Sequence, residues 1–175
     1  VLLVAGSISK FYPTQSEIFV LEQLLKMYGD KYKIVYRTFF DDKSKQDFVN
    51  MALKKYSNFE VQFIPNAAAG LEEYLRDENY EEDGYIREIL RTDLVVSLGS
   101  TSLSLDAAYL GVATITCWIA PEEFKKRRGW DKLFDEKKKL RHVYKYFPNV
   151  FSMNELNFSI ERMLVDKTES IKISK

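Results

Sequence analysis

The chain contains very little cysteine and histidine, with one residue of each among 175. A single cysteine, Cys117, can neither close an internal disulfide nor form a thiolate cluster, which argues against a small secreted fold held by disulfides. The lone His142 has no histidine partner for a zinc site, so we expect no metal. The pattern also places no acid to orient His142 in a serine–histidine–acid triad, and no catalytic residue can be assigned.

Long apolar runs and net charge are absent too. No run approaches the roughly 20 residues of a membrane-spanning helix. The 26 basic and 26 acidic side chains cancel, and 14% of the residues are aromatic. This composition excludes most disordered chains and argues against a dedicated nucleic-acid binder. The chain begins inside an apolar run, without Met, so we expect it to be an excised part of a longer protein.

Short apolar runs alternate with longer segments of helical spacing. The runs predicted as strands are Val1–Ala5, Lys33–Tyr36, Val61–Ile64, Leu94–Leu98, Ala113–Cys117 and Val150–Phe151. Three of them are continuously apolar, which is typical of parallel strands covered on both faces. Right-handed crossovers then predict an α/β fold. We expect an open, doubly wound, Rossmann-like parallel sheet of about six strands, in the order 3-2-1-4-5-6, with helices on both faces.

The segments between the strands carry helix signals. Thr14–Glu17 has the sequence of a capping box, and Gly29 ends the helix that follows it. Ser44 is the candidate cap of a second helix. Further helices are predicted near Tyr85–Arg91, at Ser102–Leu110 and at Asn154–Val165. No linker-like or repeated segment interrupts the pattern, so we expect one nucleotide-sugar-binding domain over 1–165 and a C-terminal tail over 166–175.

Two small, hydroxyl-rich loops follow the first and fourth predicted strands. The candidate binding residues in them are Gly6, Ser7, Gly99, Ser100, Thr101 and Ser102. In the predicted strand order these loops meet where the chain reverses direction, which is the usual ligand crevice of such sheets. Helix N-termini and glycines there favour a phosphate group. The alternative is that Ser and Thr are ordinary helix caps. Neither loop is GxGxxG or GxxxxGK[ST], which disfavours a dinucleotide fingerprint and a Walker A site.

Two charged residues near these loops are further candidates. Asp106 lies one turn beyond Ser102, and Asp disfavours helix interiors, so a compensating role is expected. Accepting hydrogen bonds from ribose hydroxyls is one such role, and a structural bond to a neighbouring loop is the other. Arg37 ends the second predicted strand. It is a candidate for contacting a phosphate or nucleobase, with a surface ion pair as the alternative.

The charges are unevenly distributed along the chain. Seven acids and one base lie between Glu72 and Asp83, and nine bases and three acids lie between Lys125 and Arg141. Solvated loops explain both segments. For the basic segment, a second interpretation is contact with an anionic donor or with an acidic membrane surface, which would make the protein peripheral to a membrane.

The stretch from Asp93 to Ile115 (DLVVSLGSTSLSLDAAYLGVATI) resembles a signature region of GT-B glycosyltransferases. In their carboxy-terminal, donor-binding domain, hydrophobic residues lead into a Ser/Thr turn, then Glu-Ala, Gly and Pro. The turn matches at Gly99–Ser102, the acid at Asp106, and the glycine at Gly111. The opening Val1–Gly6 is also similar to the start of that domain, although only the region from 93 to 115 is motif-grade.

The resemblance implies that the Gly6 and Gly99 loops bind the diphosphate of a nucleotide sugar, and that Asp106 replaces the ribose-binding Glu. It implies a cytoplasmic, metal-independent transferase in polysaccharide or glycolipid synthesis, without a cofactor. Its acceptor-binding domain would precede this chain, and the fragment alone would turn over little. Where some capsule and teichoic-acid polymer transferases carry Arg-Pro-His-Pro, this chain has Arg37-Thr-Phe-Phe, so the role of that His cannot be transferred.

Two other functions stay open. A non-catalytic Rossmann-like interaction domain, derived from a transferase, would use the sheet edge or the charged segments to hold a protein partner. A sugar-nucleotide epimerase-like domain would share the fold, but the acids and the His on which such enzymes depend have no clear place here. The sequence does not specify the sugar, the nucleobase, the acceptor, the stereochemical outcome or the oligomeric state.

Overall fold

The structure is a computed structural model of the chain that describes residues 1–7, 11–38, 42–63, 82–99, 101–128 and 147–165. Their strands form a single parallel sheet in the order β3-β2-β1-β4-β5-β6. The strands are β1 (Leu2–Ala5), β2 (Ile34–Thr38), β3 (Phe59–Phe63), β4 (Leu94–Leu98), β5 (Thr114–Cys117) and β6 (Asn149–Val150). The predicted Rossmann-like α/β fold and its strand order are therefore confirmed.

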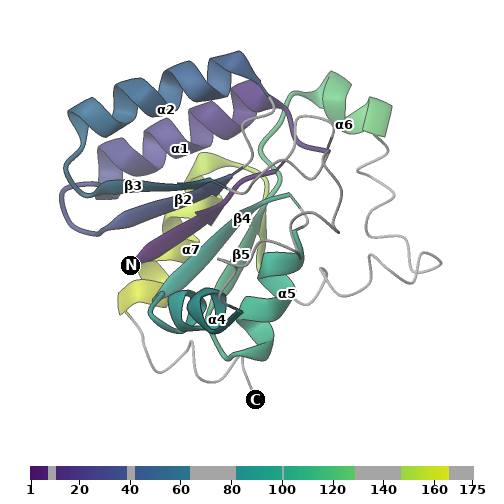
Figure 1. Cartoon of the computed structure of the whole chain (residues 1–175). Helices are drawn as coiled ribbons and strands as arrows, with labels where there is room; N and C mark the ends of the chain where they lie inside the picture. Colours follow the sequence, from purple (N-terminus) through teal and green to yellow (C-terminus); the bar gives the residue numbers. More distant parts are fainter. Residues whose placement is uncertain (8–10, 39–41, 64–81, 100, 129–146, 166–175) are drawn as a thin grey trace.

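Helices cover both faces of this sheet. They are α1 (Thr14–Tyr28), α2 (Lys43–Lys55), α4 (Glu82–Leu90), α5 (Ser102–Tyr109), α6 (Glu122–Arg128) and α7 (Met153–Val165). Figure 1 shows α1, α2 and α7 on one side of the sheet and α4 and α5 on the other. Within the described ranges, none of the helices has the length and apolarity needed to cross a membrane.

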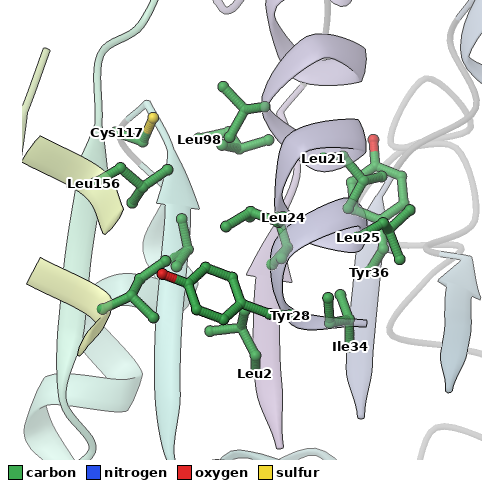
Figure 2. Packing of buried hydrophobic residues seen from close by; sticks show 14 of the residues in the cluster. Leu2, Leu21, Leu24, Leu25, Tyr28, Ile34, Tyr36, Leu98, Cys117 and Leu156 are labelled. Carbon is green, nitrogen blue, oxygen red and sulfur yellow. The ribbon is translucent and has the colours of Figure 1, made fainter. Parts of the chain in front are cut away.

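Each face of the sheet has its own apolar core. On the larger side, Leu21, Leu24 and Leu25 of α1 pack over the central strands, and Leu156 of α7 packs near Cys117 (Figure 2). On the other side, Leu3 and Ala5 of β1 pack with residues of α4 and α5. Alternate residues of β1 thus enter opposite cores. This explains why the strand is apolar at every position.

Local structure differs from the sequence interpretation at three helix starts. Pro13 is the N-cap of α1 and no side chain caps it, so the predicted capping box is wrong. The cap of α2 is Asp42 rather than Ser44: its Oδ1 accepts from the Ser44 backbone N–H at 2.7 Å. The helix α6 was not predicted.

Candidate functional site

The central strands bring the two predicted loops to one edge of the sheet. β1 pairs with β4 in parallel register, with Ala5 opposite Ser97, so Gly6 and Gly99 follow neighbouring strand ends. Gly99 has φ +74°, a left-handed conformation that disfavours other residues. The residues after β1 and β4 therefore lie at the point where the strand order reverses, which is where ligands bind in this class of fold.

The space next to Gly99 is occupied by an aromatic ring. Tyr12 is fully buried, and its Cδ2 would lie 3.2 Å from a Cβ added to Gly99. Its hydroxyl donates to the carbonyl oxygen of Ile119 at 2.7 Å. The Tyr12 side chain thus lies beside the end of β4 and contacts the chain beyond β5. Tyr12 belongs to the core under α1 and α7, so its ring fills the space beside Gly99 on that side of the sheet.

At the start of α5, hydroxyl groups bond to one another. The Ser97 hydroxyl donates to the Gly99 carbonyl at 2.7 Å and lies 3.0 Å from the Thr101 hydroxyl. Thr101 Oγ1 lies 3.2 Å from Ser104 Oγ. Thr101 is the N-cap residue, but its side chain makes no capping bond to the helix backbone. The predicted contact residue Thr101 therefore already takes part in a network that shapes the loop.

The first backbone N–H groups of α5 are the ones a ligand would meet. Within the described part of the chain, the N–H groups of Ser102 and Leu103 have no protein acceptor. The Ser102 side chain is exposed. Unpaired N–H groups and the positive end of the helix dipole favour an anion at this position. Ser100, which precedes them, lies outside the described residues.

A buried carboxylate of α1 binds the chain just after β1. Glu17 Oε1 accepts from the Ser7 backbone N–H at 3.3 Å, from the Thr38 hydroxyl at 3.3 Å, and from the Tyr36 hydroxyl. A Cβ on Gly6 would lie 2.3 Å from the same oxygen. Glycine is therefore required at position 6 by Glu17. The N–H of Ser7 is used inside the protein, so it does not face a ligand as the sequence suggested.

The charge of Glu17 is balanced by an equally buried lysine. Lys45 Nζ of α2 lies 3.1 Å from Glu17 Oε2, and neither side chain is exposed. The same ammonium group donates to the Ser7 carbonyl oxygen at 2.8 Å. Burial raises the pKa of Glu17, whereas Lys45 and the hydrogen bonds act in the opposite direction. The pair thus fixes the backbone N–H and carbonyl groups of Ser7, and it holds the chain after β1 rather than exposing charge to a ligand.

Sequence reasoning missed Glu17 and Lys45. The capping-box interpretation assigned Glu17 to the helix backbone, and no signal in α1 separates the two roles. For Lys45 a signal exists. Lys45, Phe48, Val49 and Ala52 are spaced i, i+3, i+4 and i+7, and all four are buried. A lysine on the apolar stripe of a helix indicates a buried partner.

Arg37 is engaged with α4. Its guanidinium lies 3.1 Å from Glu88 Oε2 and 3.5 Å from Gln62 Oε1, and 4.8 Å above the Tyr85 ring. Only 14% of the Arg37 side chain is exposed. Burial raises the pKa of Glu88, and the nearby Arg37 opposes that rise. The ion pair weighed in the sequence analysis is thus present, and Arg37 is directed toward α4.

Asp106 lies on the exposed side of α5. Its Oδ2 accepts a hydrogen bond from the Tyr85 hydroxyl at 2.7 Å. Asp106 therefore makes a structural bond, but its partner belongs to helix α4 and not to a loop as the sequence analysis weighed. Asp106 and Ser102 are four residues apart on one helix, which corresponds to about 6 Å of rise. Tyr85 was placed in a helix by the sequence but was not considered a site residue.

Most of the remaining candidate residues lie outside the part of the chain that the structure describes. The basic segment Lys125–Arg141 is described only as far as Arg128, in α6, and most of the acidic segment, His142 and the tail 166–175 are outside the described residues. Among the residues that the structure describes, no three His, Cys, Asp or Glu side chains form a cluster that could hold a metal ion. Cys117 is buried, and burial raises its pKa to about 11, so it is a poor nucleophile.

The chain was compared with protein-family models and with curated proteins, and it matches none of them.

Proposed function

We propose that this domain is the donor-binding half of a GT-B glycosyltransferase and binds a nucleotide-activated sugar. One observation carries the proposal: the unpaired N–H groups of Ser102 and Leu103 lie at the sheet edge where β1 and β4 end. An exposed carboxylate, Asp106, stands one turn further along the same helix. The fold and its strand order agree with this assignment but are shared by many functions.

The chemistry follows from charge. A diphosphate leaving group gains negative charge as the bond to the sugar breaks. Fixed N–H groups and the α5 dipole stabilise that charge without a metal. Tyr12 confines the diphosphate to the α5 side of the edge, and the Asp106 carboxylate accepts hydrogen bonds from the ribose. The acceptor and its base belong to a preceding domain, so this chain binds the donor and turns over little. Polysaccharide or glycolipid synthesis in the cytoplasm is the setting we propose.

Calorimetry with UDP-, GDP-, CMP- and CDP-linked sugars tests the proposal. Ser102→Glu places a carboxylate in the first turn of α5, where the dipole favours it and the fold is retained. It repels a bound diphosphate, so we expect at least a tenfold loss of affinity, equivalent to about 1.4 kcal/mol. Ser102→Gln is the matched control, because it has the same size without the charge. Absence of binding to every donor, or equal affinity of the Glu variant and the wild type, contradicts the proposal.

A second function is favoured by a different observation. Tyr12, Ser7 and Asp106 all make bonds within the protein at the edge where a ligand is proposed. This is the arrangement expected of a non-catalytic interaction domain descended from a transferase. Stable co-purification of a protein partner, together with no donor binding in the calorimetric panel, would favour this second function over the first.

A further inference from the structure

Side chains tie α4 to α5 next to the proposed ribose position. The Tyr85 hydroxyl of α4 donates to Asp106 Oδ2 of α5 at 2.7 Å. Within the described part of the chain, no protein group donates to Asp106 Oδ1. An ionised carboxylate accepts about four hydrogen bonds, so the bond from Tyr85 leaves capacity for a ligand.

The Tyr85 ring is itself held in place. Arg37 of β2 lies over its face, 4.8 Å from the ring centre. The guanidinium is fixed in turn by Glu88 of α4 at 3.1 Å and contacts Gln62 of β3 at 3.5 Å. A cation over the ring attracts it electrostatically and restricts its movement. The row Arg37–Tyr85–Asp106 therefore connects β2 to an exposed carboxylate, and Figure 1 shows α4 and α5 on the same side of the sheet.

A free aspartate on a helix surface changes rotamer readily and bonds to nearby backbone. The bond from Tyr85 restricts Asp106 to the orientation in which Oδ2 faces α4. Its Oδ1 then stays available beside the α5 surface that begins at Ser102. A carboxylate fixed this way before binding loses less conformational freedom when a ligand arrives.

We infer that Tyr85 is a positioning residue: its hydroxyl sets the Asp106 carboxylate to accept from the ribose hydroxyls of a ribonucleotide, and so favours ribose over 2′-deoxyribose. This inference rests on the proposed function. It adds to that function a preference for ribose, which Tyr85 produces by orienting Asp106. It also assigns to Arg37 the role of fixing the Tyr85 ring.

The test compares UDP with 2′-deoxy-UDP, and GDP with 2′-deoxy-GDP, by calorimetry on the full chain. Tyr85→Phe keeps the ring under Arg37 and removes only the hydroxyl. We expect the preference for ribose to fall about tenfold, the effect of one charge-assisted hydrogen bond. Affinity for the 2′-deoxy forms stays unchanged, which a general structural defect would not allow. Tyr109→Phe is the matched control, because Tyr109 on α5 is 92% exposed.

Repeating the Tyr85→Phe substitution in an Asp106→Ala variant shows whether Tyr85 acts by positioning Asp106 or by contacting the ribose itself. In Asp106→Ala the ribose preference is lost, and adding Tyr85→Phe has no further effect if Tyr85 acts through Asp106. Unchanged ribose preference in the single Tyr85→Phe variant overturns the inference while the proposed function stands. If the wild type binds none of the nucleotides or nucleotide sugars, both fall.

Discussion

Replacing Lys45 by methionine tests whether the buried charge pair holds the loop after β1. The substitution removes the ammonium group that lies 3.1 Å from Glu17 Oε2 and 2.8 Å from the Ser7 carbonyl oxygen. It leaves a carboxylate with no exposed surface and no balancing charge. Breaking a buried pair in this way costs about 3–5 kcal/mol.

The structure places the expected loss near the lower end of that range. Glu17 Oε1 keeps its bonds from Ser7, Tyr36 and Thr38, which offset part of the desolvation of the remaining charge. The Ser7 carbonyl loses its bond from Lys45 at the same time, which adds about 1 kcal/mol. We therefore expect Lys45→Met to lower the free energy of unfolding by about 3–4 kcal/mol, a large share of a typical domain stability of about 5–15 kcal/mol.

Urea unfolding followed by circular dichroism measures the loss, and the double variant Lys45→Met/Glu17→Gln supplies the control. Glutamine can still accept the three hydrogen bonds but carries no charge. The double variant should therefore recover at least about 1.5 kcal/mol relative to Lys45→Met alone. A loss below about 1 kcal/mol in the single variant, or strictly additive effects in the double variant, refutes the reasoning.

Two further predictions concern Glu17, and a substitution at Gly111 serves as the control for the second. Burial raises the pKa of Glu17 in the folded protein above 4.5. The protonated form of Glu17 therefore favours folding, and this contribution to stability is lost as the pH rises through the folded pKa. The free energy of unfolding of wild type minus that of Glu17→Gln should therefore fall as the pH rises above about 4.5, and a rise contradicts the assignment. Gly6→Ala should cost about 2–3 kcal/mol, since its Cβ would lie 2.3 Å from Glu17 Oε1. Gly111→Ala, with φ +77° and no atom within 4 Å of the added Cβ, should lose about 1 kcal/mol in the same urea assay, from backbone strain alone. Equal losses at the two glycines would argue against a steric role for Glu17.

The fold was predictable from sequence because its signals are local and repeated. Strands such as Leu2–Ala5 are short and apolar at every position, and segments with the spacing of amphipathic helices lie between the strands. The right-handedness of the connections between parallel strands then leaves few possible strand orders. The boundaries were less predictable. The predicted strand Val61–Ile64 is observed as Phe59–Phe63, since the pairing with β2, rather than local composition, determines where a strand begins.

The candidate site was only partly predictable. The adjacency of the Gly6 and Gly99 loops follows from strand order alone. The partners of individual side chains do not, because they come from distant segments: Glu17 meets Lys45 of the next helix, and Asp106 meets Tyr85 across α4 and α5. Nothing in the sequence around Tyr12 indicated that its ring would fill the space beside Gly99. A pattern in one segment indicates which face is buried, but it does not identify what will lie against that face.

The position of β1 has a consequence for biosynthesis. This strand lies at the centre of the sheet, yet it is made before its neighbour β4, which emerges only after α1, β2, α2, β3 and α4 have been synthesised. Until then one side of β1 has no hydrogen-bonding partner, and its apolar residues are open to association with other chains. The nascent polypeptide therefore cannot complete its core from the first half alone. Truncations that end before Leu94 should aggregate rather than yield a smaller stable unit.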